Sequence, residues 1–181
     1  STVQIDIGNA QRFNIKYTDK DNSTKSPVIL HTAILGTIGR YIFAQLDAIV
    51  RNEVKGKKPQ LPYWLSPTQA RIVPVSEKFV EEAIKIADRL NKEKIRTDVD
   101  DKGITLPKKI LDAEKEWVPY IIVVGEKELE SKKLAVRTRQ TGKIENMDEK
   151  ELITKLRKEQ GDFPWRPLPL PSLVSKRPVF A

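Results

Sequence analysis

The 181-residue chain contains no cysteine and a single histidine, His31. Without cysteine, these residues can form neither a disulfide nor a thiolate metal site. With no second histidine either, they cannot complete a zinc site from the usual cysteine and histidine ligands. The absence of cysteine is typical of proteins in a reducing compartment, so we expect a cytoplasmic location.

Long apolar runs are also missing. No run approaches the roughly 20 residues needed to span a bilayer, so we expect no membrane segment. The first residues, Ser-Thr-Val-Gln, contain neither an initiator methionine nor the basic start of a signal peptide, which favours a fragment of a longer chain. The length suffices for one or two compact domains.

Charge is present in excess of one sign. Thirty-three Lys and Arg face 25 Asp and Glu, which gives a formal net charge of +8. Such an excess favours a polyanionic partner such as nucleic acid, because binding releases condensed counterions. Surfaces rich in Lys and Glu are also typical of thermophilic proteins, so the charge alone leaves both explanations open.

The first third of the chain has the pattern of antiparallel strands followed by a helix. Val3, Ile5 and Ile7 alternate with polar residues, which predicts a strand with one apolar face. Residues 13–17 and 28–30 predict two further strands around a polar turn at 18–23, and together these form an antiparallel meander. Apolar residues recur at three- and four-residue steps over 34–50, which predicts an amphipathic helix.

After residues 61–67, where two prolines interrupt any helix, strands and helices alternate, and we place a domain boundary in this region. We expect strands at 70–75, 95–99, 120–124 and 134–139, and helices at 77–91, 106–116 and 148–158. This βαβαββα order predicts an α/β fold with a mixed, largely parallel sheet. Asp148 is expected to cap the last helix, and the proline-rich residues 163–171 to lie extended over the surface.

Three features could carry chemistry. A lone histidine on an apolar strand, such as His31, is more often a structural side chain than a ligand. Arg40 lies near a helix start, where the macrodipole disfavours a cation, so it suits either a bound anion or plain exposure. The polar face formed by Thr2, Gln4 and Asp6 could line a site or face solvent.

Several separated segments resemble threonyl-tRNA synthetases, a family of class II aminoacyl-tRNA synthetases. They are residues 2–6, the stretch from His31 to Arg40, 62–67, 118–128 and 134–139, and the closing residues 166–171 and 175–178 resemble the archaeal branch. The resemblance implies that residues 27–41 are motif 3. Residues 1–58 would then be the end of the catalytic domain, and residues 59–181 an anticodon-binding domain with an extended, proline-rich tail.

The resemblance implies roles for four residues near the start of the chain. His31 matches a ligand of the catalytic Zn²⁺, whose other ligands would lie upstream of these residues. Arg40 matches the arginine that stacks on the adenine of ATP and contacts its phosphates. Gln4 matches a residue lining the pocket for the aminoacyl end, and Thr2 a neighbour of the adenosine ribose.

In the second domain, Glu128 and Arg137 match residues that hydrogen-bond anticodon bases, and we expect both side chains to point towards one end of the sheet. Gly103 and Leu111 stand where bacterial relatives have an asparagine and an arginine that contact the anticodon. Candidates to replace those contacts are Lys108, Lys109 and Asp112. Two motif 3 positions also depart from the common pattern, Thr32 and Gly39.

The resemblance implies a threonine–tRNA ligase that uses threonine, ATP with Mg²⁺, and tRNA(Thr), and that forms a homodimer when full length. Motifs 1 and 2 are absent from these residues, so we expect them to be inactive alone and to contribute anticodon recognition. An alternative is a non-catalytic RNA-binding accessory module with the same fold. A relative specific for proline, histidine or glycine would share the second domain but would not explain His31.

Overall fold

The computed structural model describes residues 2–53, 56 and 58–178. The chain divides into two compact units, Ser1–Val50 and Arg51–Ala181. No helix in the described part of the chain is long and apolar enough to cross a bilayer.

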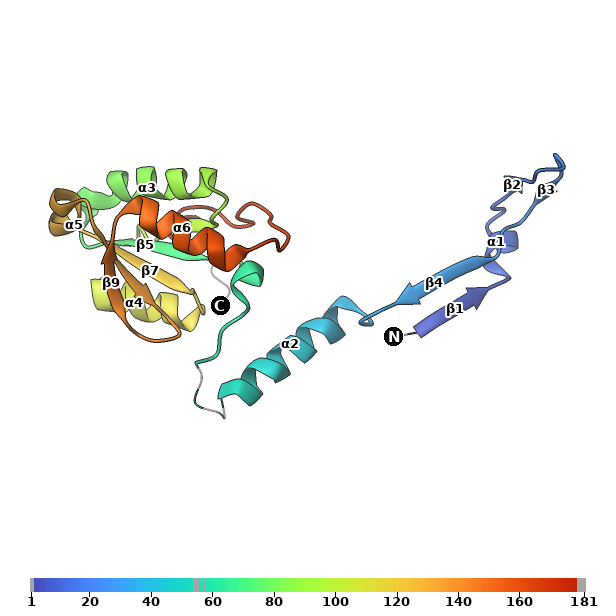
Figure 1. Cartoon of the computed structure of the whole chain (residues 1–181), viewed down its shortest axis with the longest axis horizontal. Helices are drawn as coiled ribbons and strands as arrows, with labels where there is room; N and C mark the ends of the chain where they lie inside the picture. Colours follow the sequence, from blue (N-terminus) through green and yellow to red (C-terminus); the bar gives the residue numbers. More distant parts are fainter. Residues whose placement is uncertain (1, 54–55, 57, 179–181) are drawn as a thin grey trace. The chain divides into compact units, whose positions relative to one another are not determined.

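The first unit contains two small antiparallel sheets and a long helix (Figure 1). Its elements are β1 (Thr2–Asp6), α1 (Asn9–Arg12), β2 (Tyr17–Thr18), β3 (Thr24–Lys25), β4 (Ile29–Ala33) and α2 (Ile38–Glu53). β1 pairs with β4, and β2 pairs with β3 in a separate hairpin. The predicted helix is confirmed, although it starts at Ile38 rather than at residue 34.

The three-stranded meander predicted for this unit is wrong. Residues 9–12, just before the strand expected at 13–17, form α1. Only Tyr17 of that expected strand lies in a strand, where it begins the β2–β3 hairpin. The Asp6 carboxylate accepts hydrogen bonds from the backbone N–H groups of Gly8 and Asn9, at 3.0 and 2.9 Å. These bonds bend the chain into α1 immediately after β1, because a carboxylate satisfies the free N–H groups at a helix start.

The second unit is a five-stranded sheet covered by helices on both faces. Its strands and helices are β5 (Ala70–Pro74), α3 (Val80–Lys92), β6 (Thr97–Val99), α4 (Leu106–Lys115), β7 (Tyr120–Val124), α5 (Glu126–Ser131), β8 (Leu134–Thr138), β9 (Ile144–Met147) and α6 (Glu149–Gln160). Short 3-10 turns lie at Tyr63–Leu65, Glu77–Phe79 and Val174–Lys176. The strand order is β6-β5-β7-β8-β9. β6, β5 and β7 run parallel to one another, β8 pairs antiparallel with β7, and β9 pairs antiparallel with β8.

The core of this unit has two layers. The larger cluster packs α3 and α6 on one face of the sheet, with Ile72, Leu90, Ile122 and Leu152 fully buried. The smaller cluster packs α4 on the other face (Figure 1). The predicted α/β fold with a mixed sheet is therefore confirmed, and the structure adds two elements to the predicted order, α5 and β9.

The ends of the second unit also follow the sequence pattern. The Asp148 carboxylate accepts a hydrogen bond from the Glu151 N–H at 2.8 Å, so the predicted cap of α6 is confirmed. Residues 163–171 contain no helix or strand, as the prolines predict. Beyond them the chain lies against β6, where the Val99 N–H donates to the carbonyl of Ser172 at 2.8 Å.

Candidate functional site

The β1–β4 pair brings Gln4 and His31 together. The two residues are direct partners in the register, and His31 Nε2–H donates to Gln4 Oε1 at 2.5 Å. Both side chains are exposed and line an open hollow of about 560 Å³ together with Asp6 and the start of α1. Hydrogen bonds at the start of α1 lower the pKa of Asp6. The Asn9 backbone N–H contributes most, followed by the Gly8 N–H and the Asn9 side chain, so this carboxylate stays ionised beside the imidazole.

Thr2 and Arg40 meet in a second, smaller hollow of about 140 Å³ at the other end of the same strand pair. Between them, Gly36 takes a positive φ of 79°, which lets the chain turn from β4 towards α2. A Cβ at Gly36 would lie 3.1 Å from Arg40 Cδ, so the glycine also leaves room for the arginine side chain. No ion-pair partner of Arg40 is found among the residues that the structure describes, and its exposed guanidinium can therefore receive an anion.

His31 offers the donor chemistry of a zinc ligand but no complete site. With Nε2 protonated towards Gln4, a neutral ring carries its lone pair on Nδ1, which is the form that binds metals. Within the described ranges, no group of three His, Cys, Asp or Glu side chains could hold a metal ion. The residues present thus fit the contribution of one ligand, with the remaining ligands from elsewhere.

In the second unit, Glu128 is held by the start of α5. Its Oε2 accepts a hydrogen bond from the backbone N–H of the N-cap residue Gly125 at 3.0 Å. The turn is tight, because a Cβ at Gly125 would lie 2.9 Å from Val75 Cγ2. Glu128 is half-buried and keeps one carboxylate oxygen beyond this bond, which could accept from a ligand.

Arg137 lies on the face of the sheet that α4 covers. Its Nε and Nη2 reach Glu114 Oε1 at 3.0 and 2.9 Å, and its side chain is 29% exposed. The monodentate pair leaves guanidinium N–H groups for another acceptor. A ligand at this position would therefore compete with, or extend, an existing ion pair.

The structure does not bring Glu128 and Arg137 to one end of the sheet, so that expectation is wrong. Arg137 pairs with Ile121 near the amino end of β7, whereas Glu128 follows the carboxyl end of the same strand. Because β8 runs antiparallel at about 3.4 Å per residue, three residues carry Arg137 roughly 10 Å away from the start of β8. A shared ligand must be long enough to contact two separate places.

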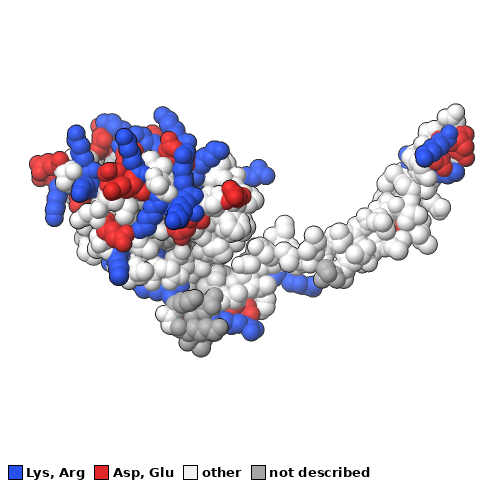
Figure 2. Space-filling view, viewed as in Figure 1, with Lys and Arg blue, Asp and Glu red and all other residues white. Residues whose placement is uncertain are grey.

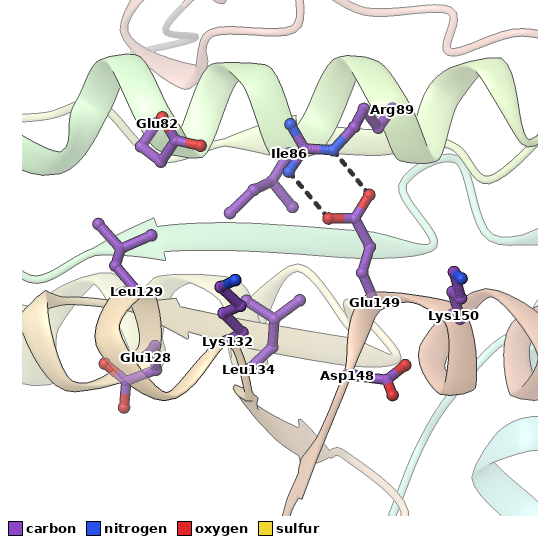
Figure 3. A pocket seen from close by; sticks show the side chains of 10 residues that line it. All are labelled: Glu82, Ile86, Arg89, Glu128, Leu129, Lys132, Leu134, Asp148, Glu149 and Lys150. Carbon is purple, nitrogen blue, oxygen red and sulfur yellow. Dashed lines mark hydrogen bonds and ion pairs between the residues drawn. The ribbon is translucent and has the colours of Figure 1, made fainter.

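A pocket of about 550 Å³ lies between α3, α5 and α6, and Glu128 is one of its lining residues (Figure 3). Its apolar wall is formed by Ile86, Leu129 and Leu134. Arg89 forms a bidentate ion pair with Glu149 across the pocket, at 2.7 and 2.8 Å, so the glutamate already neutralises much of the arginine's charge.

The three residues predicted to replace the missing anticodon contacts differ in their exposure to solvent. Lys109 is 4% exposed, and its Nζ donates to the carbonyls of Pro74 and Asp100 at 3.3 and 2.9 Å, so the idea that it faces a ligand is wrong. Lys108 and Asp112 lie at the surface as an ion pair of 3.0 Å, beside the exposed Leu111.

Lys102 belongs to the same surface cluster but was not predicted from the sequence. Lys102 Nζ lies 3.3 Å from Asp112 and 3.6 Å from the buried Asp100. A polar run directly after a parallel strand could have indicated this position, because such ends meet at one edge of a sheet. Gly103, next in the chain, has open space around it.

The two motif 3 positions that depart from the common pattern lie close to these sites. The Thr32 hydroxyl donates to the Thr2 carbonyl at 3.0 Å and fastens β4 to β1. Gly39 lies in the first turn of α2 with no atom near a would-be Cβ. Neither position blocks the hollows at His31 or Arg40.

Known proteins match both the second unit and the whole chain. A family model described as "Anticodon binding domain" matches residues 69–159. The threonine–tRNA ligase of Pyrobaculum calidifontis is 51% identical over 179 residues, which is 99% of this chain and 29% of that protein. The threonine–tRNA ligase of Pyrococcus horikoshii is 49% identical over 180 residues, again 99% of this chain and 29% of that protein.

A solved structure adds support for the fold. The RNA-binding domain of threonyl-tRNA synthetase from Cryptosporidium parvum is 33% identical, with a TM-score of 0.59, over 87% of this chain and 38% of that one. The chain thus spans less than a third of the length of the curated relatives, 29% in each case above. The chain belongs to the anticodon-binding domain family, in the form found in the C-terminal region of threonyl-tRNA synthetases.

Proposed function

We propose that the chain is the C-terminal part of a threonine–tRNA ligase and that its second domain binds the anticodon of tRNA(Thr). The observation that carries this proposal is the continuous similarity to threonine–tRNA ligases over nearly the whole chain, with the anticodon-binding domain at residues 69–159. The domain assignment, 1–58 for the end of a catalytic domain and 59–181 for the anticodon-binding domain, belongs to the same proposal.

Base recognition would rest on Glu128 and Arg137. The free carboxylate oxygen of Glu128 can accept from a base amino group, and the remaining N–H groups of Arg137 can donate to base carbonyl or ring nitrogen atoms. Their positions near opposite ends of β7 suit an anticodon loop with splayed bases better than a small ligand. The positive net charge of +8 favours the approach of the RNA backbone.

Binding of tRNA to the purified chain tests this role. Arg137→Ala should weaken tRNA(Thr) binding and relax discrimination at one anticodon base by about 1–3 kcal/mol. Glu114→Gln is the matched control, because it removes the same ion pair but leaves the guanidinium free. Equal losses in the two variants, or an equal loss for unrelated tRNA, would contradict a base contact by Arg137.

The first unit would complete one edge of an active site supplied mainly by upstream residues. Arg40 would hold the adenine and phosphates of ATP, bound with Mg²⁺, and Thr2 would lie by the ribose, which agrees with their shared hollow. Gln4 and His31 would line the aminoacyl pocket. Zn²⁺, when bound with His31 as one ligand, would coordinate the amino and hydroxyl groups of threonine, a contact that valine cannot make.

Two measurements test this part. In the full-length protein, His31→Ala should lower the zinc content measured by atomic absorption, and unchanged metal would return His31 to a structural role. The 181-residue chain alone should show no threonine-dependent ATP–pyrophosphate exchange. The intact mass of the natural protein distinguishes the two functions. A ligase should be several times the length of this chain, as the relatives are, whereas a separate RNA-binding module should have a mass of 20.7 kDa.

We also propose, from the class II assignment, that the full-length protein is a homodimer in the cytoplasm. Sedimentation of the full-length protein would test the dimer.

A further inference from the structure

The loop at residues 100–105 lies where the α/β sheet of the second unit is best placed to meet a ligand. It follows β6, whose crossover helix α4 covers one face, whereas the crossover helix α3 of the neighbouring β5 covers the other face (Figure 1). The connections therefore diverge at the carboxyl ends of β5 and β6. In open α/β sheets, ligands bind at such switch points.

One lysine of this loop and one lysine in the first turn of α4 could contact RNA phosphates. Lys102 and Lys108 both contact Asp112, at 3.3 and 3.0 Å, and their side chains are 30% and 51% exposed. The exposed ammonium groups of these two lysines can each donate to a phosphate oxygen, and the nearby carboxylates of Asp100, Asp101 and Asp112 offset their charge. Figure 2 shows Lys and Arg mixed with Asp and Glu over the visible face of the second unit.

The last described residues of the chain run alongside this loop. Residues 172–177, named here the C-terminal strap, begin with the bond from the Val99 N–H to the Ser172 carbonyl and a parallel bridge between Val99 and Leu173. Val174 is buried at 9% exposure. The strap thus pairs briefly with β6 at the edge of the sheet, and Val174 packs in the core.

Two polar contacts then hold the strap to the strand and the loop. Ser175 donates from its backbone N–H and its hydroxyl to the two oxygens of Asp101, at 2.9 and 2.5 Å. Arg177 Nη2 reaches Asp98 Oδ2 at 2.5 Å, inside a network in which the fully buried Arg71 also contacts Asp98 and Glu116. The hydrogen bonds from Ser175 outweigh burial and lower the pKa of Asp101, so its carboxylate is ionised at neutral pH.

We propose that the C-terminal strap positions the 100–105 loop for RNA binding, with Asp101 and Ser175 as the positioning pair. This inference rests on the proposed function. Asp101 itself is an acid and would repel a phosphate, so it acts through the loop rather than on the RNA. Its bonds to Ser175 restrict the loop before RNA arrives and reduce the entropy lost on binding.

Variants of equal charge test the proposal in the full 181-residue chain. Asp101→Ala and Asp101→Asn both remove the negative charge, but asparagine can still accept from the Ser175 N–H. We expect Asp101→Ala to weaken tRNA(Thr) binding about tenfold at fixed salt, and Asp101→Asn to restore most of that loss. Hydrogen exchange of the amides of residues 100–105 should be faster in the alanine variant.

Ser175→Ala gives a milder second variant, because it removes one hydrogen bond and keeps the N–H. Ser23→Ala is its matched control, since Ser23 donates to Asp21 at 2.6 Å in the first unit. Weaker tRNA binding by Ser175→Ala, with Ser23→Ala unchanged, would support the strap even if Asp101→Ala fails to fold. If the parent chain binds tRNA(Thr) but both strap variants bind as the parent does, the positioning role is wrong and the proposed function stands. If the parent chain does not bind tRNA(Thr), the proposed function itself fails.

Discussion

The two units use equally regular apolar patterns with opposite results. In β1, Val3 and Ile5 are 71% and 70% exposed, whereas in β7 the apolar residues Ile121 and Ile122 are fully buried. In α2, Ile38 is 80% exposed, whereas Leu90 of α3 is fully buried. Periodicity therefore determines the element, but burial depends on a second layer, which the described residues supply only to the second unit.

Expressing the two units separately should change the cooperativity of unfolding more than any single substitution. Residues 51–181 expressed alone should unfold in one cooperative transition, because both core layers lie within them. Residues 1–50 alone should show no cooperative transition, since Ala10 and Ile49 are the only buried apolar residues described there. Circular dichroism during urea titration measures both. A sharp transition in residues 1–50 would break the contrast between the units.

Arg71→Met should be the most destabilising point substitution in the second unit. It leaves the fully buried Asp98 without its main partner, and breaking a buried pair costs about 3–5 kcal/mol. The double variant Arg71→Met/Asp98→Leu should recover part of the loss, because no unpaired charge remains. Urea unfolding measures the free energies, and a loss below about 1 kcal/mol in the single variant would show that Arg177 and Thr68 suffice for Asp98.

The same substitution in both units tests the contrast directly. Ile122→Ala should lower the free energy of unfolding by about 2–5 kcal/mol, because the side chain is fully buried. Ile5→Ala, at a side chain 70% exposed, should change it by about 0.5 kcal/mol or less. Similar losses at the two positions would mean that β1 is covered in solution.

A smaller, pH-dependent effect is expected at Asp100. Burial raises the pKa of this carboxyl, so the folded protein keeps its proton to a higher pH than the unfolded chain does. Its contribution to stability is complete below the unfolded pKa of about 3.9 and is lost as the pH rises through the folded value. Asp100→Asn should therefore gain stability relative to the parent as the pH rises above about 4. Unfolding at several pH values measures this, and a constant difference would contradict it.

Much of the second unit could be predicted because its strands and helices are apolar and well separated. The two missed elements lack that signal. No residue of α5 is buried, and in β9 only Met147 is buried. Likewise α1 depends on the Asp6 side chain rather than on a repeating pattern. The start of α1 depends on side-chain hydrogen bonds and β9 on its pairing with β8, and periodicity detects neither.

The candidate sites show the same limit. The sequence could indicate His31, Gln4, Thr2 and Arg40 one by one, but only the β1–β4 register shows which of them are neighbours. Register also decided that Arg137 lies away from Glu128. Spacing along the chain cannot supply this, because a shift of one residue moves every side chain to the other face.

The pairing of residues 172–173 with β6 also bears on how the protein avoids sticking to itself. A sheet exposes unpaired backbone groups at each of its two outer strands, and these can recruit strands from other molecules into aggregates. The chain closes one such border with its own last residues, at Val99. The other border, β9, carries Glu145, which binds Lys155 at 2.6 Å, and charge of this kind discourages a foreign strand. Removing the final ten residues would therefore expose backbone groups of β6 and promote aggregation.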